Sequence, residues 1–242
     1  MRSVPRTKAA QRGFTLVEMA IVIAIAGLIV TFVVNSFGTQ MQVRRETTTR
    51  DKMDVIAKLV GNRLIQNGQA PCPADPAVAQ NNAAFGQARA ACATAALSEG
   101  IVPFQTLGIP VDMARDGWSR FITYRTSPTI AVTASKAAAC TAVRAGVDVN
   151  VNDQNGNPVV ANTVIHAVVL ISHGQNGVGA FLADGTATRQ AGTFADANET
   201  ANGTTGSANK ISANPGQSPL YDDVTVWKTV PVLVTSFNTS CP

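Results

Sequence analysis

Glu18 is the residue whose type and position point most directly to chemistry. It is the only formally charged residue in an apolar run of 24 residues from Phe14 to Phe37. A helix of that length rises about 36 Å, enough to cross a hydrocarbon core of about 30 Å. A carboxylate at the bilayer centre costs about 2.5 to 3.5 kcal/mol unless it is neutralised. The pattern therefore predicts a membrane span in which Glu18 finds a partner.

The basic residues before this run predict its orientation. Four of the 19 basic residues precede Gly13, so removing that leader would leave 15 basic against 15 acidic residues. Lys and Arg beside a first span hold that side in the cytoplasm. We therefore expect a cytoplasmic N-terminus, an inner-membrane span and a periplasmic head. The head after residue 67 has nine basic and eleven acidic residues, so we predict no nucleic-acid binding.

Four cysteines lie in the predicted exported part: Cys72, Cys92, Cys140 and Cys241. An oxidising compartment favours disulfides, and four cysteines allow three pairings. We favour Cys72 with Cys92, which closes a short loop, and Cys140 with Cys241, which holds the C-terminus. No cysteine spacing typical of a zinc site occurs.

Catalytic patterns are not found. Ser172 and His173 are neighbours, but adjacent residues of a strand point to opposite faces, and no nucleophile-elbow motif surrounds the serine. His166 lies in an apolar run typical of a packed histidine. We predict that the protein is not an enzyme.

A long helix must position Glu18. Residues 38–67 are polar, contain no proline, and repeat Met53, Ile56, Val60 and Leu64 at spacings of three and four. This spacing predicts an amphipathic continuation of the span, so that one helix runs from about residue 14 to 66.

The rest of the chain, residues 68–242, predicts a β-rich globular head. β-branched and aromatic runs over about 100–110, 116–126, 129–135, 164–174 and 224–237 predict strands, and no two helical segments lie between them. We therefore expect an α+β fold, with the long N-terminal helix packed on a small antiparallel sheet. Residues 191–219 are poor in large apolar side chains and predict a flexible loop.

The N-terminal residues resemble the processing motif of type IV pilins and type II secretion pseudopilins: Gly13, Phe14, Thr15, Leu16, Val17 and Glu18. The resemblance implies cleavage after Gly13 by a prepilin peptidase, which makes residues 1–13 a leader peptide, and N-methylation of Phe14. It implies that Glu18 pairs with the N-terminal amine of a neighbouring subunit. The expected product is a structural subunit, a minor pilin or pseudopilin, in a pilus or a secretion pseudopilus.

The head is similar, more loosely, to certain prepilin-type secretion proteins. Major pseudopilins hold calcium in a loop before a C-terminal strand with aspartate and tryptophan, and Asp222, Asp223 and Trp227 look similar. The resemblance thus implies a calcium site at Asp222 and Asp223, although the preceding loop contains few acids, Asp196 and Glu199.

Three alternatives stay open. The chain is also compatible with an adhesin or DNA-uptake minor pilin that has a binding head, with a plain membrane-anchored exported protein, and with an anchored enzyme. The sequence does not decide between pilus and pseudopilus, between major and minor subunit, or between filament tip and shaft.

Overall fold

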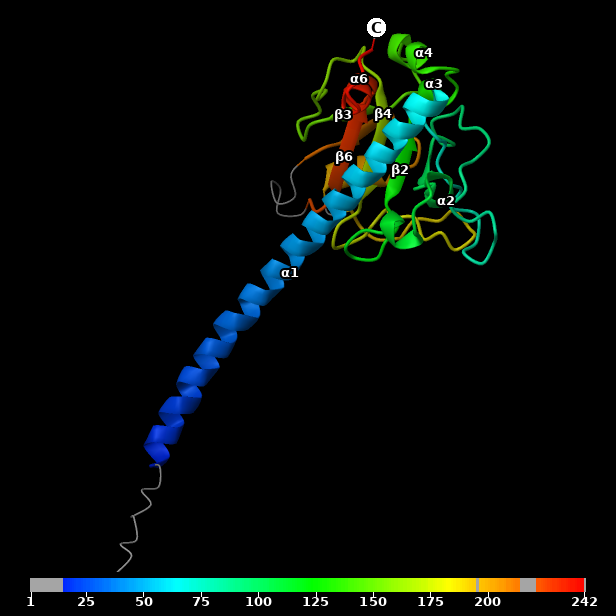
Figure 1. The fold of residues 1–242 in the computed structure, drawn as a ribbon. Helices are drawn as coiled ribbons and strands as arrows, with labels where there is room; N and C mark the ends of the chain where they lie inside the picture. The colour runs from blue at the N-terminus through cyan, green and yellow to red at the C-terminus, as the bar shows by residue number, and fades with distance from the viewer. Residues whose placement is uncertain (1–14, 195, 214–220, 242) are drawn as a thin grey trace, which may run out of the picture. The chain divides into compact units, whose positions relative to one another are not determined.

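The computed structural model describes residues 15–194, 196–213 and 221–241, without the side chains of residues 32–37 and 39 (Figure 1). The expected leader, residues 1–13, and Phe14 lie outside this part. The chain divides into two compact units, Met1–Val43 and Arg44–Pro242. Helix α1, Leu16–Asn67, contributes to both units.

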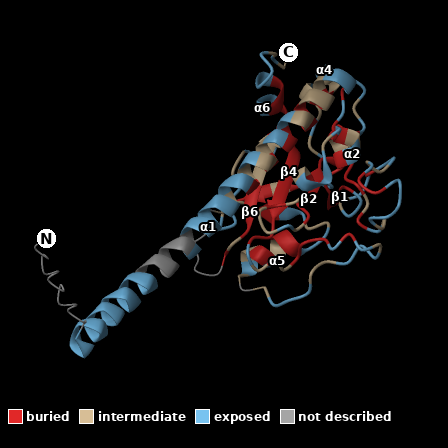
Figure 2. Ribbon diagram, turned by 60° about the horizontal axis from the view of Figure 1, so that its bottom comes forward, coloured by how far each residue is buried: buried red, intermediate tan, exposed pale blue. Residues whose placement is uncertain are grey.

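The first unit consists of the first part of α1. From Leu16 to Val30 every side chain is exposed, including Leu16 at 87% and Val17 at 66% (Figure 2). Among the residues that the structure describes, no helix is both long and apolar enough to cross a membrane. The span expected over residues 14–37 includes Phe14 and the side chains of 32–37, which are not described.

The second unit is built on a four-stranded antiparallel sheet. Its order is β1 (Glu99–Ile101), β2 (Thr123–Thr126), β4 (His166–Ser172) and β6 (Val224–Thr229). The structure is thus α+β with a small antiparallel sheet, as expected. A second sheet was not expected: β3 (Asn150–Asn152) pairs in parallel with β5 (Asn209–Ile211).

The sheet is covered on both faces. One face packs against the apolar stripe predicted on α1. The residues of this stripe are fully buried and share a core with Leu170 of β4: Met53, Ile56, Val60 and Leu64. On the other face, Val169 and Ile171 of β4 pack with Val149 and Val151 around β3. Strand β4 is therefore buried throughout its length.

Three predicted strands are wrong in part, because helix-starting residues override β-branched side chains. Within 100–110 the strand ends at Ile101, and α2 (Phe104–Leu107) begins directly after Pro103. Within 129–135 the chain forms most of α3 (Pro128–Ala131), whose Ser127 side chain caps the amide of Ile130. Within 224–237 the strand ends at Thr229 and α6 (Val230–Thr235) begins with Pro231 in its first turn. Other short helices before β4 are the 3₁₀ helix η1 (Val111–Ala114) and α4 (Lys136–Thr141).

The expected flexible loop at 191–219 is a further difference. The described residues of this segment contain α5 (Ala197–Gly203) and β5. Their buried side chains are mainly polar, including Glu199, Asn202 and Lys210. Hydrogen bonds and ion pairs, rather than an apolar core, hold this segment in place.

Two disulfides join Cys72 to Cys92 and Cys140 to Cys241, with Cα–Cα distances of 5.7 and 5.4 Å. This is the predicted pairing. The first disulfide closes a local loop after α1, and the second ties the C-terminal residues to α4.

Candidate functional site

Glu18 lies in the first turn of α1 and forms a reciprocal cap with Thr15. The Thr15 backbone amide and hydroxyl donate to Glu18 Oε2 at 2.8 and 2.9 Å, and the Glu18 amide donates to Thr15 Oγ1 at 3.2 Å. Such a capping box satisfies two amides that a helix start leaves unpaired. The carboxylate is therefore held within its own chain. Gly13 and Phe14, the expected cleavage and methylation residues, lie outside the described residues.

The helix around Glu18 exposes an unbroken apolar surface. Side chains that are at least half exposed include Ile21, Ile23, Leu28 and Val30. Burying such side chains fully is worth about 1.5 to 3 kcal/mol each. Soluble monomers rarely expose so much contiguous apolar surface, which marks contact with other proteins or with a membrane.

Comparison with known protein families finds a match in this part of the chain. The family model described as the prokaryotic N-terminal methylation motif matches residues 8–34. The chain carries the type IV pilin and pseudopilin signature. Proteins with this motif are structural, pilin-like subunits rather than catalysts. Comparisons with curated proteins and with solved structures find no match.

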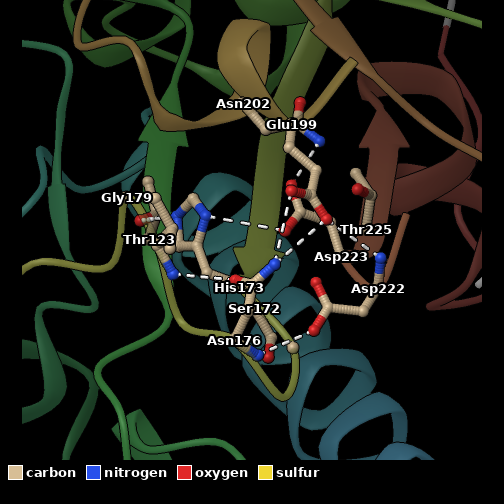
Figure 3. Close-up of polar contacts among 12 residues, drawn as sticks. Thr123, Ser172, His173, Asn176, Gly179, Glu199, Asn202, Asp222, Asp223 and Thr225 are labelled. Atoms are coloured by element: carbon tan, nitrogen blue, oxygen red, sulfur yellow. Dashed lines mark hydrogen bonds and ion pairs between the residues drawn. The ribbon is translucent and has the colours of Figure 1, made fainter. Parts of the chain in front are cut away.

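A second candidate site in this pilin-like chain is a cluster of three carboxylates in the head (Figure 3). Glu199 on α5 and Asp222 and Asp223 before β6 each offer an oxygen, and the three oxygens lie within 4.8 Å of one another. Glu199 and Asp223 are each 1% exposed. Like charges this close are unfavourable unless protons or a cation neutralise them.

Amide groups position these carboxylates. The Asn176 backbone amide donates to Asp222 Oδ2 at 2.8 Å, and its side chain donates to Glu199 at 3.3 Å. Asn202 Nδ2 donates to Asp223 Oδ2 at 2.9 Å. Asp222 Oδ1 and Asp223 Oδ1 have no hydrogen-bond partner among the described residues. Two buried oxygens are thus left for a ligand.

The protonation of the cluster reflects its burial. Burial, together with the nearby Glu199, raises the pKa of Asp222 to about 6. Burial also raises the pKa of Asp223 well above its ordinary value, and Glu199 and Asp222 add to this. A bound divalent cation would neutralise the charge of these close, buried carboxylates and so stabilise them. Calcium binds oxygen ligands of this kind. The donor set therefore fits the calcium that the family resemblance implies.

Sequence reasoning identified only part of this cluster. Asp222 and Asp223 are adjacent in the chain, and the resemblance points to both, whereas it assigns no role to Glu199. It is 23 residues from Asp222, and only the folding of α5 against Asn176 brings the two together. The signal in the sequence was an isolated acid in a segment poor in apolar residues.

Ser172 and His173 form no catalytic arrangement with each other. Ser172 Oγ donates to Asp116 at 2.6 Å, whereas His173 Nε2 lies 3.0 Å from Thr123 Oγ1. His173 Nδ1 lies 3.7 Å from Asp223 Oδ1, and burial lowers the pKa of His173 well below its ordinary value. Both side chains are at most 1% exposed, so no substrate can reach them without a change of structure.

His166 packs edge-on against Trp227, with ring centroids 5.4 Å apart. Burial lowers the pKa of His166 to about 4. The imidazole is therefore neutral at pH 7 and serves as part of the core, as its apolar neighbours in the sequence suggest.

Proposed function

We propose that this protein is a structural subunit of a type IV pilus or a type II secretion pseudopilus, and specifically a minor subunit. Its precursor is cut between Gly13 and Phe14 by a prepilin peptidase and methylated on Phe14. It then packs through α1 against other subunits. The observation that carries the proposal is the methylation motif over residues 8–34, which includes the start of α1, where the apolar side chains from Leu16 to Val30 are exposed.

The proposal includes an inner-membrane stage. Residues 14–37 form a single span, with the basic leader in the cytoplasm and the head in the periplasm. The leader charges support this orientation. The two disulfides support an oxidising compartment for the head. The head's assigned role is structural, without a catalytic step.

Glu18 would exchange partners on assembly. In the isolated chain Thr15 satisfies the carboxylate with one amide and one hydroxyl. Neither donor carries a formal charge, so the carboxylate keeps its negative charge. The methylated amine of a neighbouring subunit would supply the opposite charge, and an ion pair removed from water strengthens in the low dielectric of a filament core.

Cleavage is tested by replacing Gly13 with a bulky residue. Gly13→Leu should leave a precursor that migrates more slowly on a gel, because the peptidase no longer accepts the residue before the cut. The matched control is Gly27→Ala, a glycine on α1 with open space around its Cα. Normal processing of Gly13→Leu would overturn the proposed identity.

Assembly is tested by Glu18→Ala. This variant should be cut normally but should enter filaments less than one tenth as often, because the incoming amine finds no carboxylate. Asp51→Ala, an exposed acid on the same helix, is the control. Wild-type filament levels in Glu18→Ala would contradict the pairing.

We also propose that Glu199, Asp222 and Asp223 hold a calcium ion that stabilises the head. Two buried carboxylate oxygens that have no hydrogen-bond partner among the described residues support this, Asp222 Oδ1 and Asp223 Oδ1. Calcium titration of the full chain in detergent, followed by calorimetry, should show one site. Asp223→Asn should abolish it, whereas Asp51→Asn should not. Equal binding by wild type and Asp223→Asn would exclude this site.

A further inference from the structure

The helix that carries Glu199 is held by polar contacts. Helix α5 has only seven residues, and its buried members are Glu199, Asn202 and Gly203. At its N-terminus the Asp196 side chain accepts from the Asn198 amide at 2.7 Å. With so little apolar surface to bury, α5 depends on what binds its C-terminus.

Lys210 of β5 occupies that position. Its Nζ donates to the backbone carbonyls of Asn202 at 3.0 Å and Thr204 at 2.8 Å, and to that of Ala201 at 3.2 Å. The last carbonyls of a helix have no partner within the helix, and a positive charge there is favourable. The ammonium group therefore caps α5 from outside.

A buried carboxylate fixes Lys210 in turn. Glu99 Oε1 lies 3.0 Å from Lys210 Nζ, and both side chains are fully buried. Arg189 and Arg125 also pair with Glu99, at 2.5 and 3.2 Å. Burial lowers the pKa of Lys210 to about 8, and Glu99 opposes that shift, so the group is charged at pH 7. Since Glu99 belongs to β1, the cap connects α5 to the central sheet.

The same helix sets two sides of the carboxylate cluster. Glu199 projects from α5 toward Asp222, and Asn202 donates to Asp223 Oδ2. Asn202 is also locked to β5, because its Oδ1 accepts from the Ile211 amide at 2.7 Å. A shift of α5 by about 1 Å would move both groups, and ligand constellations tolerate only about 0.5 Å.

We infer that Lys210 is a positioning residue for the cation site: by capping α5, its ammonium group holds Glu199 where it can share a cation with Asp222 and Asp223. The same cap holds Asn202 where it can orient Asp223. This inference rests on the calcium site proposed above. Lys210 itself does not contact the ion.

The experiment compares calcium binding by wild type, Lys210→Met and Lys228→Met, each as the full chain in detergent, by calorimetry with calcium chloride. Lys228 is the matched control, since its Nζ pairs with Asp54 at 3.0 Å on the surface. Lys210→Met should raise the calcium Kd at least tenfold, and Lys228→Met should leave it within twofold. A role limited to general stability would lower the melting temperature of calcium-free Lys210→Met without changing its Kd, and that result would overturn the inference.

Lys210→Arg covers the case in which Lys210→Met does not fold. It keeps the charge beside Glu99, but a planar guanidinium cannot direct its donors to three converging carbonyls as an ammonium does. Its Kd should rise at least threefold, and an unchanged Kd would again overturn the assignment. If wild type binds no calcium, the proposed site itself fails and the role of Lys210 falls with it. If wild type binds and both Lys210 variants bind equally well, only the inference fails.

Discussion

The carboxylate cluster makes a quantitative prediction about Asp222. Its pKa is about 6 in the folded protein against 3.8 ordinarily, chiefly because of burial. At pH 5 the folded state therefore holds a proton that the unfolded state has lost. Raising the pH to 7 removes this proton from the folded state, so Asp222 stabilises the calcium-free head less at pH 7 than at pH 5.

The linkage relation gives the size of the effect. Integrated from pH 5 to pH 7, these two pKa values correspond to about 1.3 kcal/mol of lost unfolding free energy. Because Asp222 is only partly buried, solvent screening reduces this to about 1 kcal/mol. Asp222→Asn has no such titration. Relative to wild type, the calcium-free variant should thus gain about 1 kcal/mol between pH 5 and pH 7.

The assay is urea unfolding of both proteins at pH 5, 6 and 7 in a calcium chelator, followed by tryptophan fluorescence. The quantity to compare is the difference in unfolding free energy between the two proteins at each pH. Burial lowers the pKa of His166 and His173, which makes stability rise with pH in both proteins, and the difference cancels this shared effect. With saturating calcium at pH 7, wild type should be more stable than Asp222→Asn, because only wild type keeps all three carboxylate ligands. A pH-independent difference without calcium would refute the proposed environment of Asp222.

Three further predictions concern the head. Replacing Cys140 and Cys241 by alanine should lower the unfolding free energy by about 4 to 5 kcal/mol, because the disulfide closes a loop of 101 residues and restricts the unfolded chain. Urea unfolding measures this loss, and a loss below about 1 kcal/mol would contradict the loop-entropy explanation. Ile56→Ala, at a fully buried position, should cost about 2 to 5 kcal/mol, whereas exposed Lys58→Ala should change stability by less than about 0.5; equal losses in thermal melts would contradict the packing of α1. Burial lowers the pKa of His166 to about 4, so between pH 6.5 and 4.5 this histidine binds a proton in the unfolded state but not in the folded state. Over that pH range wild type should therefore lose about 1 to 2 kcal/mol more unfolding free energy than His166→Asn. Equal losses of unfolding free energy in the two proteins would contradict this.

Features with a local or periodic origin could be predicted from the sequence. The spacing of Met53, Ile56, Val60 and Leu64 fixes which side of α1 is buried, because a helix repeats every 3.6 residues. The small antiparallel sheet is confirmed. The reason for expecting it, that no two helical segments lie between the strands, is wrong, because α3 and α4 lie between β2 and β4. The role of Glu18 in subunit assembly, which the resemblance implies, stays a prediction.

Features that depend on distant polar partners could not be predicted. Lys210 and Glu99 are 111 residues apart, and neither belongs to a pattern that suggests burial. The sequence does not reveal this ion pair, and residues 191–219 contain few large apolar side chains. The sequence therefore predicts a flexible loop there. The parallel pairing of β3 with β5 was missed for the same reason, since the two strands are 59 residues apart.

The two disulfides divide the completion of the head into an early and a late stage. Cys72 and Cys92 are 20 residues apart and can join as soon as that short stretch of the chain is present. Cys140 must wait for Cys241, and β4 must wait for β6. Until the C-terminal residues arrive, the edge of β4 that pairs with β6 has no partner strand. For a head exported as proposed above, oxidation of the second pair would thus report that the chain has crossed the membrane through residue 241.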